Sequence, residues 1–140
     1  RSYGFFEEYR MEDADYAVVA MSSSAGTAKA AVNTLRAQGK KVGLIKLRTF
    51  RPFPAEEIAK AAKGLKALAI MDKSDSFSGN GGPLGAEVRA ALYNDAHIIP
   101  TCNYLYGLGG RDVKIDDFYE VFAELENGNF SVCRYLGVRE

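Results

Sequence analysis

The chain has 140 residues, of which 47% are hydrophobic, so it is long enough to fold as one domain with a buried core. Its 18 acidic and 18 basic residues are interleaved, so the chain lacks the cationic stripe that is typical of proteins that bind nucleic acid. No apolar run approaches the roughly 20 residues that span a membrane. The two cysteines, Cys102 and Cys133, lack the spacing of a zinc site, an iron–sulfur cluster or a disulfide framework. We therefore expect a cytoplasmic protein with reduced thiols and with no nucleic-acid or membrane partner.

Short apolar runs alternate with helical periodicity along the chain. Residues 1–15 are expected to form a short lead-in helix and residues 128–140 an irregular tail. Between them, nearly continuous apolar runs predict buried strands at residues 16–21, 42–47, 67–71 and 97–106. Pro100 has no N–H to donate, so it marks the start or an edge position of the last strand. Apolar residues spaced three and four apart predict the helices, which begin after Met21, at Pro54, at Pro83 and after Asp112, with glycine ends at Gly39, Gly64 and Gly128.

This alternation of strands and helices predicts βαβ units. The expected fold class is α/β, a three-layer α/β/α sandwich with a mostly parallel sheet, as a single domain over residues 1–140. Because the chain starts at Arg1, we expect a fragment or the C-terminal part of a longer subunit. Ligands of such sheets bind at the carboxyl ends of the strands. The loops "SSSAGT", "RTFRPFP", "DKSDSFSGNGG" and "YGLGGRD" are all expected to lie at that edge.

The stretch "MSSSAGTAKAAV" joins the first buried strand to its helix and invites two interpretations. Unpaired amide groups and the helix dipole favour an anion there, which makes a weak anion site of Ser22, Ser23, Ser24 and Thr27. The alternative is that Ser24 or a neighbouring serine caps the helix by accepting its orphan N–H groups. We favour the cap.

An anion site at this stretch is typical of a flavodoxin-like FMN-binding module, which we keep as an alternative function. The isoalloxazine ring also needs an aromatic shelf, and the chain has no tryptophan and only Phe77 on the loop after the third strand. A P-loop is excluded, since GxxxxGK[ST] is absent. A phosphoacceptor role for Asp72 is disfavoured, because Met21 and Ser22 stand where receiver domains carry an acidic pair for magnesium.

Several motifs occur in a fixed order over more than 100 residues. "KLRTFRPFP" is the most specific, "MDKSDSFSGNGGPLGAEVRAALY" follows, and "YGLGGRD" comes last. Together they resemble the C-terminal domain II of the α subunit of 2-oxoacid:ferredoxin oxidoreductases, the enzymes that include pyruvate synthase. That domain is itself similar to the transketolase C-terminal domain. The resemblance implies an enzyme that oxidises pyruvate or a related 2-oxoacid with thiamine diphosphate, magnesium and iron–sulfur clusters, makes an acyl-CoA and reduces ferredoxin.

The chain lacks the parts for this chemistry by itself. It has no GDG motif followed by a downstream asparagine for the magnesium diphosphate, and its single histidine, His97, lies in an apolar stretch. We therefore assign no catalytic residue, no metal ligand and no cofactor to this chain alone. It is expected to be an inactive structural domain that supports a site made elsewhere in the complex.

The family motifs supply contact candidates toward other domains or subunits of the complex. These candidates are Arg48, Arg51, Phe53, Arg111 and Asp112. Arginines pair carboxylates readily, and ferredoxin and CoA are expected as partners only of the whole enzyme. Lys114 stands where the family often has a threonine, which leaves Asp112 as a candidate cap of the last helix. A free-standing α/β interaction domain is the remaining alternative.

Overall fold

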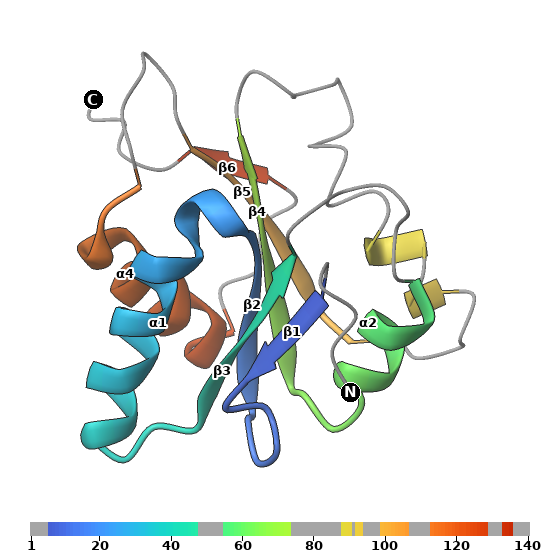
Figure 1. The fold of residues 1–140 in the computed structure, drawn as a ribbon, viewed down its shortest axis with the longest axis horizontal. Coiled ribbons are helices and arrows are strands. Elements are labelled where there is room, and N and C mark those ends of the chain that lie inside the picture. The colour runs from blue at the N-terminus through green and yellow to red at the C-terminus, as the bar shows by residue number, and fades with distance from the viewer. Residues whose placement is uncertain are drawn as a thin grey trace.

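A mostly parallel six-stranded sheet forms the centre of the protein in a computed structural model (Figure 1). The structure describes residues 6–47, 55–73, 88–90, 92–93, 99–106, 113–128 and 133–135. The strand order is β1-β3-β2-β4-β5-β6, and only the pairing of β1 with β3 is antiparallel. The strands are β1 (Phe6–Tyr9), β2 (Tyr16–Met21), β3 (Val42–Leu47), β4 (Ala67–Lys73), β5 (Thr101–Tyr106) and β6 (Cys133–Tyr135).

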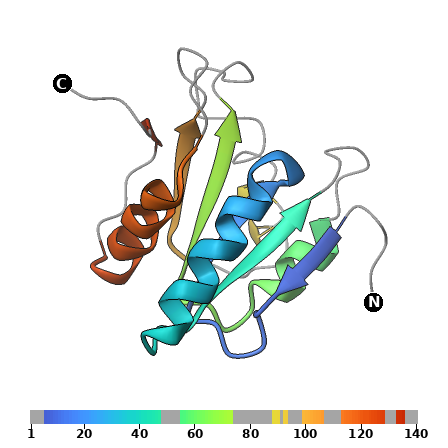
Figure 2. The same cartoon turned by 60° about the vertical axis from the view of Figure 1, so that its left-hand side comes forward.

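Helices cover both faces of this sheet (Figure 2). One face packs against α1 (Ser22–Ala37) and α4 (Ile115–Glu126), and the other against α2 (Ala55–Ala61) and the helical residues 88–90 and 92–93. The three-layer α/β/α sandwich expected from the sequence is therefore confirmed.

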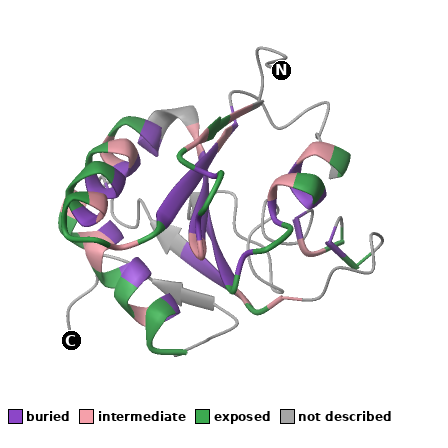
Figure 3. Ribbon diagram, turned by 90° about the horizontal axis from the view of Figure 1, so that it is seen from below, coloured by how far each residue is buried: buried purple, intermediate pink, exposed green. Residues whose placement is uncertain are grey.

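The inner strands are apolar because both of their faces are buried (Figure 3). Successive side chains of a strand point to opposite faces. Val18 and Ala20 of β2 accordingly pack toward α1 and α4, whereas Ala17 and Val19 pack toward α2. The strands thus read as continuous apolar runs, the signal that predicted them.

The predicted lead-in helix over residues 1–15 is wrong, because Phe6–Tyr9 form the edge strand β1. Its residues pair antiparallel with β3, in a register that sets Glu7 opposite Lys46 and Tyr9 opposite Leu44. Four residues carry too little periodicity to reveal a strand. The open edge of β3 decides their conformation, and that edge is set by tertiary structure.

The predicted irregular tail over residues 128–140 also needs correction, since Cys133–Tyr135 form β6 and pair parallel with β5. The bounds of two other predicted strands also differ from those in the structure. The fourth predicted strand starts at Thr101, immediately after Pro100, and the third continues through Asp72 to Lys73. Pro100 thus precedes the strand start, as its missing N–H indicates.

The helix ends match their sequence signals. Gly39, Gly64 and Gly128 all have positive φ angles, of 87°, 88° and 74°, where glycine is favoured over residues with a side chain. At the start of α4, the Asp117 carboxylate accepts the backbone N–H of Lys114 at 2.8 Å. Asp117 therefore supplies an N-terminal cap bond, and Asp112 lies outside the described residues.

Candidate functional edge of the sheet

The connections of the sheet define one candidate site edge. From β2 the chain passes through α1 to β3 on one side, whereas β4 is followed by β5 on the other side. Strands β2 and β4 are neighbours, so the strand order reverses between them. Ligands of open α/β sheets bind at the carboxyl ends of the strands beside such a reversal. The candidate edge is therefore formed by Met21 and the start of α1 together with Asp72 and Lys73.

The serine stretch lies at this edge but forms no loop. The helix α1 begins at Ser22, directly after β2 ends at Met21. Met21 is the N-cap residue, in an extended conformation and without a side-chain cap bond. Ser24 is 2% exposed, and its hydroxyl donates to the Met21 carbonyl at 3.3 Å. The prediction that Ser24 caps the helix is therefore wrong, because a residue of the preceding strand occupies the cap position.

Of the other anion candidates, Thr27 is half-buried on α1, and the side chains of Ser22 and Ser23 lie outside the described part of the structure. The anion site thus stays a prediction.

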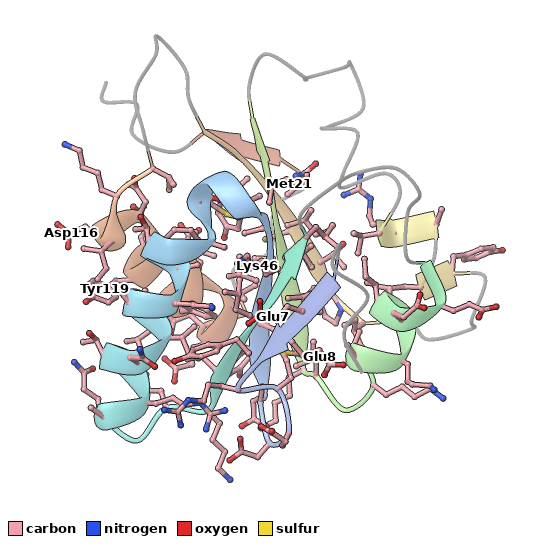
Figure 4. All side chains as sticks on the ribbon, viewed as in Figure 1. Glu7, Glu8, Met21, Lys46, Asp116 and Tyr119 are labelled. Carbon is pink, nitrogen blue, oxygen red and sulfur yellow. The ribbon has the colours of Figure 1, made fainter. Side chains whose placement is uncertain are left out.

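A charge cluster lies between β1, β3 and α1 (Figure 4). The Glu7 carboxylate lies 3.4 Å from the Lys29 ammonium and 3.7 Å from that of Lys46. Tyr9, on the same face of β1, donates its hydroxyl to Asn33 Oδ1 at 2.7 Å. These contacts fasten the first strand to the first helix. Sequence periodicity misses them, because the partners are more than 20 residues apart.

Arg36 fixes the loop between β1 and β2. Its Nε donates to the carbonyl of Val42 at 2.8 Å, and its Nη2 donates to the carbonyl of Arg10 at 2.8 Å and to the Asp13 carboxylate at 2.7 Å. The hydrogen bond from Arg36 lowers the pKa of the Asp13 carboxyl below its usual range. One guanidinium therefore joins α1, β3 and the loop that follows β1.

Buried polar contacts join β5 to its neighbours. Tyr104 is fully buried, and its hydroxyl donates to Glu124 Oε1 of α4 at 2.7 Å. The buried Asn103 points to the opposite face and donates its amide to the Ile70 carbonyl at 3.1 Å. Burial, followed by the hydrogen bond to Glu124, raises the pKa of Tyr104 far above its usual value.

The raised pKa of Tyr104 predicts a loss of stability at alkaline pH. In the unfolded chain this phenol ionises near pH 10, whereas the folded protein retains the proton, so the unfolded state binds fewer protons above that pH. The free energy of unfolding should therefore fall as the pH rises above about 10, by up to about 1.4 kcal/mol per pH unit from this group.

Tyr104→Phe provides the test of that slope. Urea unfolding between about pH 8 and pH 11 should show a shallower alkaline loss in the variant than in the wild type. Below pH 9 the variant should be less stable by about 0.5–1.5 kcal/mol, since it lacks the bond to Glu124. Equal alkaline slopes in the two proteins would contradict the assignment, because all other titrating groups are shared.

A cavity of about 300 Å³ lies at the opposite edge, among the amino-terminal ends of β2 and β3 and the carboxyl-terminal ends of α1 and α4. Lys40 lies in the connection between α1 and β3, and its ammonium pairs with the Glu126 carboxylate of α4 at 3.1 Å. The lining side chains are of both charge signs and are partly paired with each other. This cavity therefore lies between the ends of two helices, away from the candidate edge. Its lining residues are Asp15, Tyr16, Gln38, Gly39, Lys40, Lys41, Val42 and Glu126.

The remaining predicted site residues lie outside the described ranges. They are Arg48, Arg51, Phe53, Phe77, His97, Arg111 and Asp112. Within the described ranges, no three histidine, cysteine, aspartate or glutamate side chains gather where they could hold a metal ion. The helices in those ranges also include none that is long and apolar enough to cross a membrane.

Comparison with known proteins identifies relatives of this fold. Residues 14–118 match the family model described as pyruvate:ferredoxin oxidoreductase core domain II. The chain is 43% identical to pyruvate synthase subunit PorA of Thermotoga maritima over its full length and 36% of that protein. It is 43% identical to the NADH-dependent phenylglyoxylate dehydrogenase subunit alpha of Aromatoleum evansii, over 86% of the chain and 29% of the relative. The ketoisovalerate oxidoreductase subunit VorA of Pyrococcus abyssi is 42% identical over 86% of the chain and 30% of that protein.

A solved structure supports the same fold. The 2-oxoglutarate:ferredoxin oxidoreductase from Magnetococcus marinus, with 2-oxoglutarate, coenzyme A and succinyl-CoA bound, superposes with a TM-score of 0.66. The sequence identity is 20%, and the match covers 88% of this chain and 20% of that one. The chain thus spans about a third of the length of the curated relatives.

Proposed function

Because the chain belongs to the pyruvate:ferredoxin oxidoreductase core domain II family, we propose that it serves as a non-catalytic assembly domain in the α subunit of a 2-oxoacid:ferredoxin oxidoreductase. The family match over residues 14–118 carries this proposal. It takes in α1, α2 and all four inner strands of the sheet. The whole enzyme oxidises a 2-oxoacid with thiamine diphosphate, releases carbon dioxide, transfers the acyl group to CoA and reduces ferredoxin through iron–sulfur clusters.

The described residues do not fit a site for the magnesium diphosphate. At the candidate edge Met21 is apolar, the Ser24 hydroxyl is bonded to a backbone carbonyl, and no cluster of possible metal ligands occurs in the described ranges. We therefore assign no step of the reaction to these residues. The domain's part is to hold its edge loops against the domains that bind the cofactors, with Arg48, Arg51, Phe53, Arg111 and Asp112 as contact candidates.

The substrate class in this proposal is the 2-oxoacids as a group. Relatives named for pyruvate, phenylglyoxylate and ketoisovalerate are all 42–43% identical to this chain. The sequence identity in this domain is therefore the same for relatives that are named for different substrates. We infer that substrate selection depends on other domains. The flavin alternative loses support, because β2 runs directly into α1 and leaves no loop to surround a phosphate.

The proposed division of labour is tested by assaying the assembled enzyme and the isolated chain side by side. The complete subunit with its partner subunits should reduce ferredoxin only when a 2-oxoacid and CoA are both present. Circular dichroism should first show that the isolated chain is folded. This chain should then show no such activity, and calorimetry should detect no binding of thiamine diphosphate or FMN at micromolar concentrations.

Each half of this test has its own contradicting outcome. Failure of all the 2-oxoacids named above to support ferredoxin reduction by the assembly would overturn the enzyme assignment. Micromolar binding of thiamine diphosphate by the isolated chain would leave that assignment intact but refute the non-catalytic role. Micromolar binding of FMN would restore the flavodoxin-like alternative.

A further inference from the structure

The edge strand β1 has few backbone contacts to hold it. It is four residues long and, among the strands that the structure describes, pairs only with β3 at the end of the sheet. Short edge strands are the first parts of a sheet to open, because few hydrogen bonds and little apolar burial resist opening. The attachment of β1 therefore depends on its side chains.

Glu7 supplies the main electrostatic attachment. Its Oε2 lies 3.4 Å from Lys29 Nζ, and its Oε1 lies 3.7 Å from Lys46 Nζ, so each lysine faces a different carboxylate oxygen. The Lys46 side chain is only 19% exposed, on the sheet face that α1 covers. Without the carboxylate, two ammonium groups would face each other in a partly buried space. Glu7 therefore both attracts the lysines and prevents their mutual repulsion.

The second attachment comes from Tyr9, and it also leads to α1. The Tyr9 hydroxyl donates to Asn33, and the Lys29 ammonium lies 5.1 Å from the centroid of the Tyr9 ring. The strand ends at Tyr9, and the next residue, Arg10, has a φ angle of 60°, which is uncommon for a residue with a side chain. Beyond Arg10 the loop is held by Arg36, so the fixed base of the strand lies at its carboxyl end.

We propose that β1 is a detachable strap across the edge of the sheet, and that the pairing of Glu7 with Lys29 and Lys46 is its lock. Residues 6–9 open as a unit about Arg10 while the rest of the sheet remains folded. Because the lock is ionic and partly exposed, its strength falls as the ionic strength rises. This property belongs to the chain itself and does not rest on the proposed enzymatic function.

Hydrogen exchange followed by mass spectrometry tests the strap in the intact chain. Glu7→Gln keeps the side-chain shape and removes the charge, and Glu8→Gln is the matched control on the same strand. Glu8 is exposed and projects from the opposite face of β1, away from the two lysines (Figure 4). At low salt we expect Glu7→Gln to speed exchange of those amides of residues 7–9 that bond to β3 by about three- to tenfold, and Glu8→Gln by less than about twofold. Exchange in β2 and β4 should stay unchanged.

Salt and a double variant separate the lock from a general loss of stability. Raising sodium chloride from about 0.05 M to about 1 M should speed exchange of amides 7–9 in the wild type but not in Glu7→Gln. Adding Lys46→Gln to Glu7→Gln should cause no further acceleration. The proposal would be overturned if the Glu7 and Glu8 variants had equal effects. It would also be overturned if amides 7–9 of the wild type exchanged no faster than the amides of β2.

Discussion

Phe118→Ala is expected to lower the free energy of unfolding by about 3–5 kcal/mol, the range typical of a buried phenylalanine. Phe118 is fully buried on α4 and belongs to the apolar cluster between α1, α4 and the sheet. Its removal leaves a cavity that the helix and the strands can close only in part, because the neighbouring side chains are already packed. Urea unfolding of the wild type and the variant measures the difference.

Two further variants control for this result. Tyr93 is 77% exposed, so Tyr93→Ala should change the free energy of unfolding by no more than about 0.5 kcal/mol. Phe118→Leu retains most of the buried volume and should cost clearly less than the alanine. A loss below about 1 kcal/mol for Phe118→Ala would contradict the packing of α4 onto the sheet.

Gly43→Ala is expected to destabilise the protein by about 1–3 kcal/mol, although the extended backbone of β3 is by itself compatible with alanine. A Cβ atom at Gly43 would lie 2.8 Å from the Arg10 carbonyl oxygen and 2.7 Å from Met11 Sδ. The methionine side chain can move aside. The carbonyl cannot move without weakening its 2.8 Å hydrogen bond from Arg36.

Gly26→Ala is the matched control, and it is expected to change the free energy of unfolding in the opposite direction. Gly26 is exposed on α1, and a Cβ atom there would have no neighbour within 4 Å. Alanine should therefore stabilise the helix by about 0.5–1 kcal/mol. The two glycine variants are compared by thermal and urea unfolding. Destabilisation by both, or by neither, would contradict the close approach of the first loop to β3.

The inner part of the fold could be predicted from the sequence because burial on both faces leaves a strong local signal. The runs "YAVVAM" and "VGLIKL" are apolar at nearly every position, and they form β2 and β3 with the predicted bounds. The glycine ends of α1 and α4 were equally readable, since a left-handed backbone conformation favours glycine. These features depend on the residues of one segment alone.

The outer strands and the polar contacts could not be predicted in this way. The strands β1 and β6 are four and three residues long, and each is defined by the neighbour that it pairs with. Likewise, nothing in the local sequence of Arg36 indicates that it binds the carbonyls of Arg10 and Val42. At the candidate edge, the serine stretch was correctly placed after β2. Its cap was not predicted, because the helix begins one residue after the strand ends.

The two outermost strands also determine what a usable piece of this protein must contain. The four inner strands run parallel, and β1 and β6 cover the hydrogen-bonding edges that β3 and β5 would otherwise expose. Exposed sheet edges pair readily with other chains and promote aggregation. A truncation that begins at the first predicted strand and ends with the last predicted helix would remove both covering strands and open the edges of β3 and β5 to self-association. A well-behaved recombinant fragment must therefore retain residues 6–9 and 133–135.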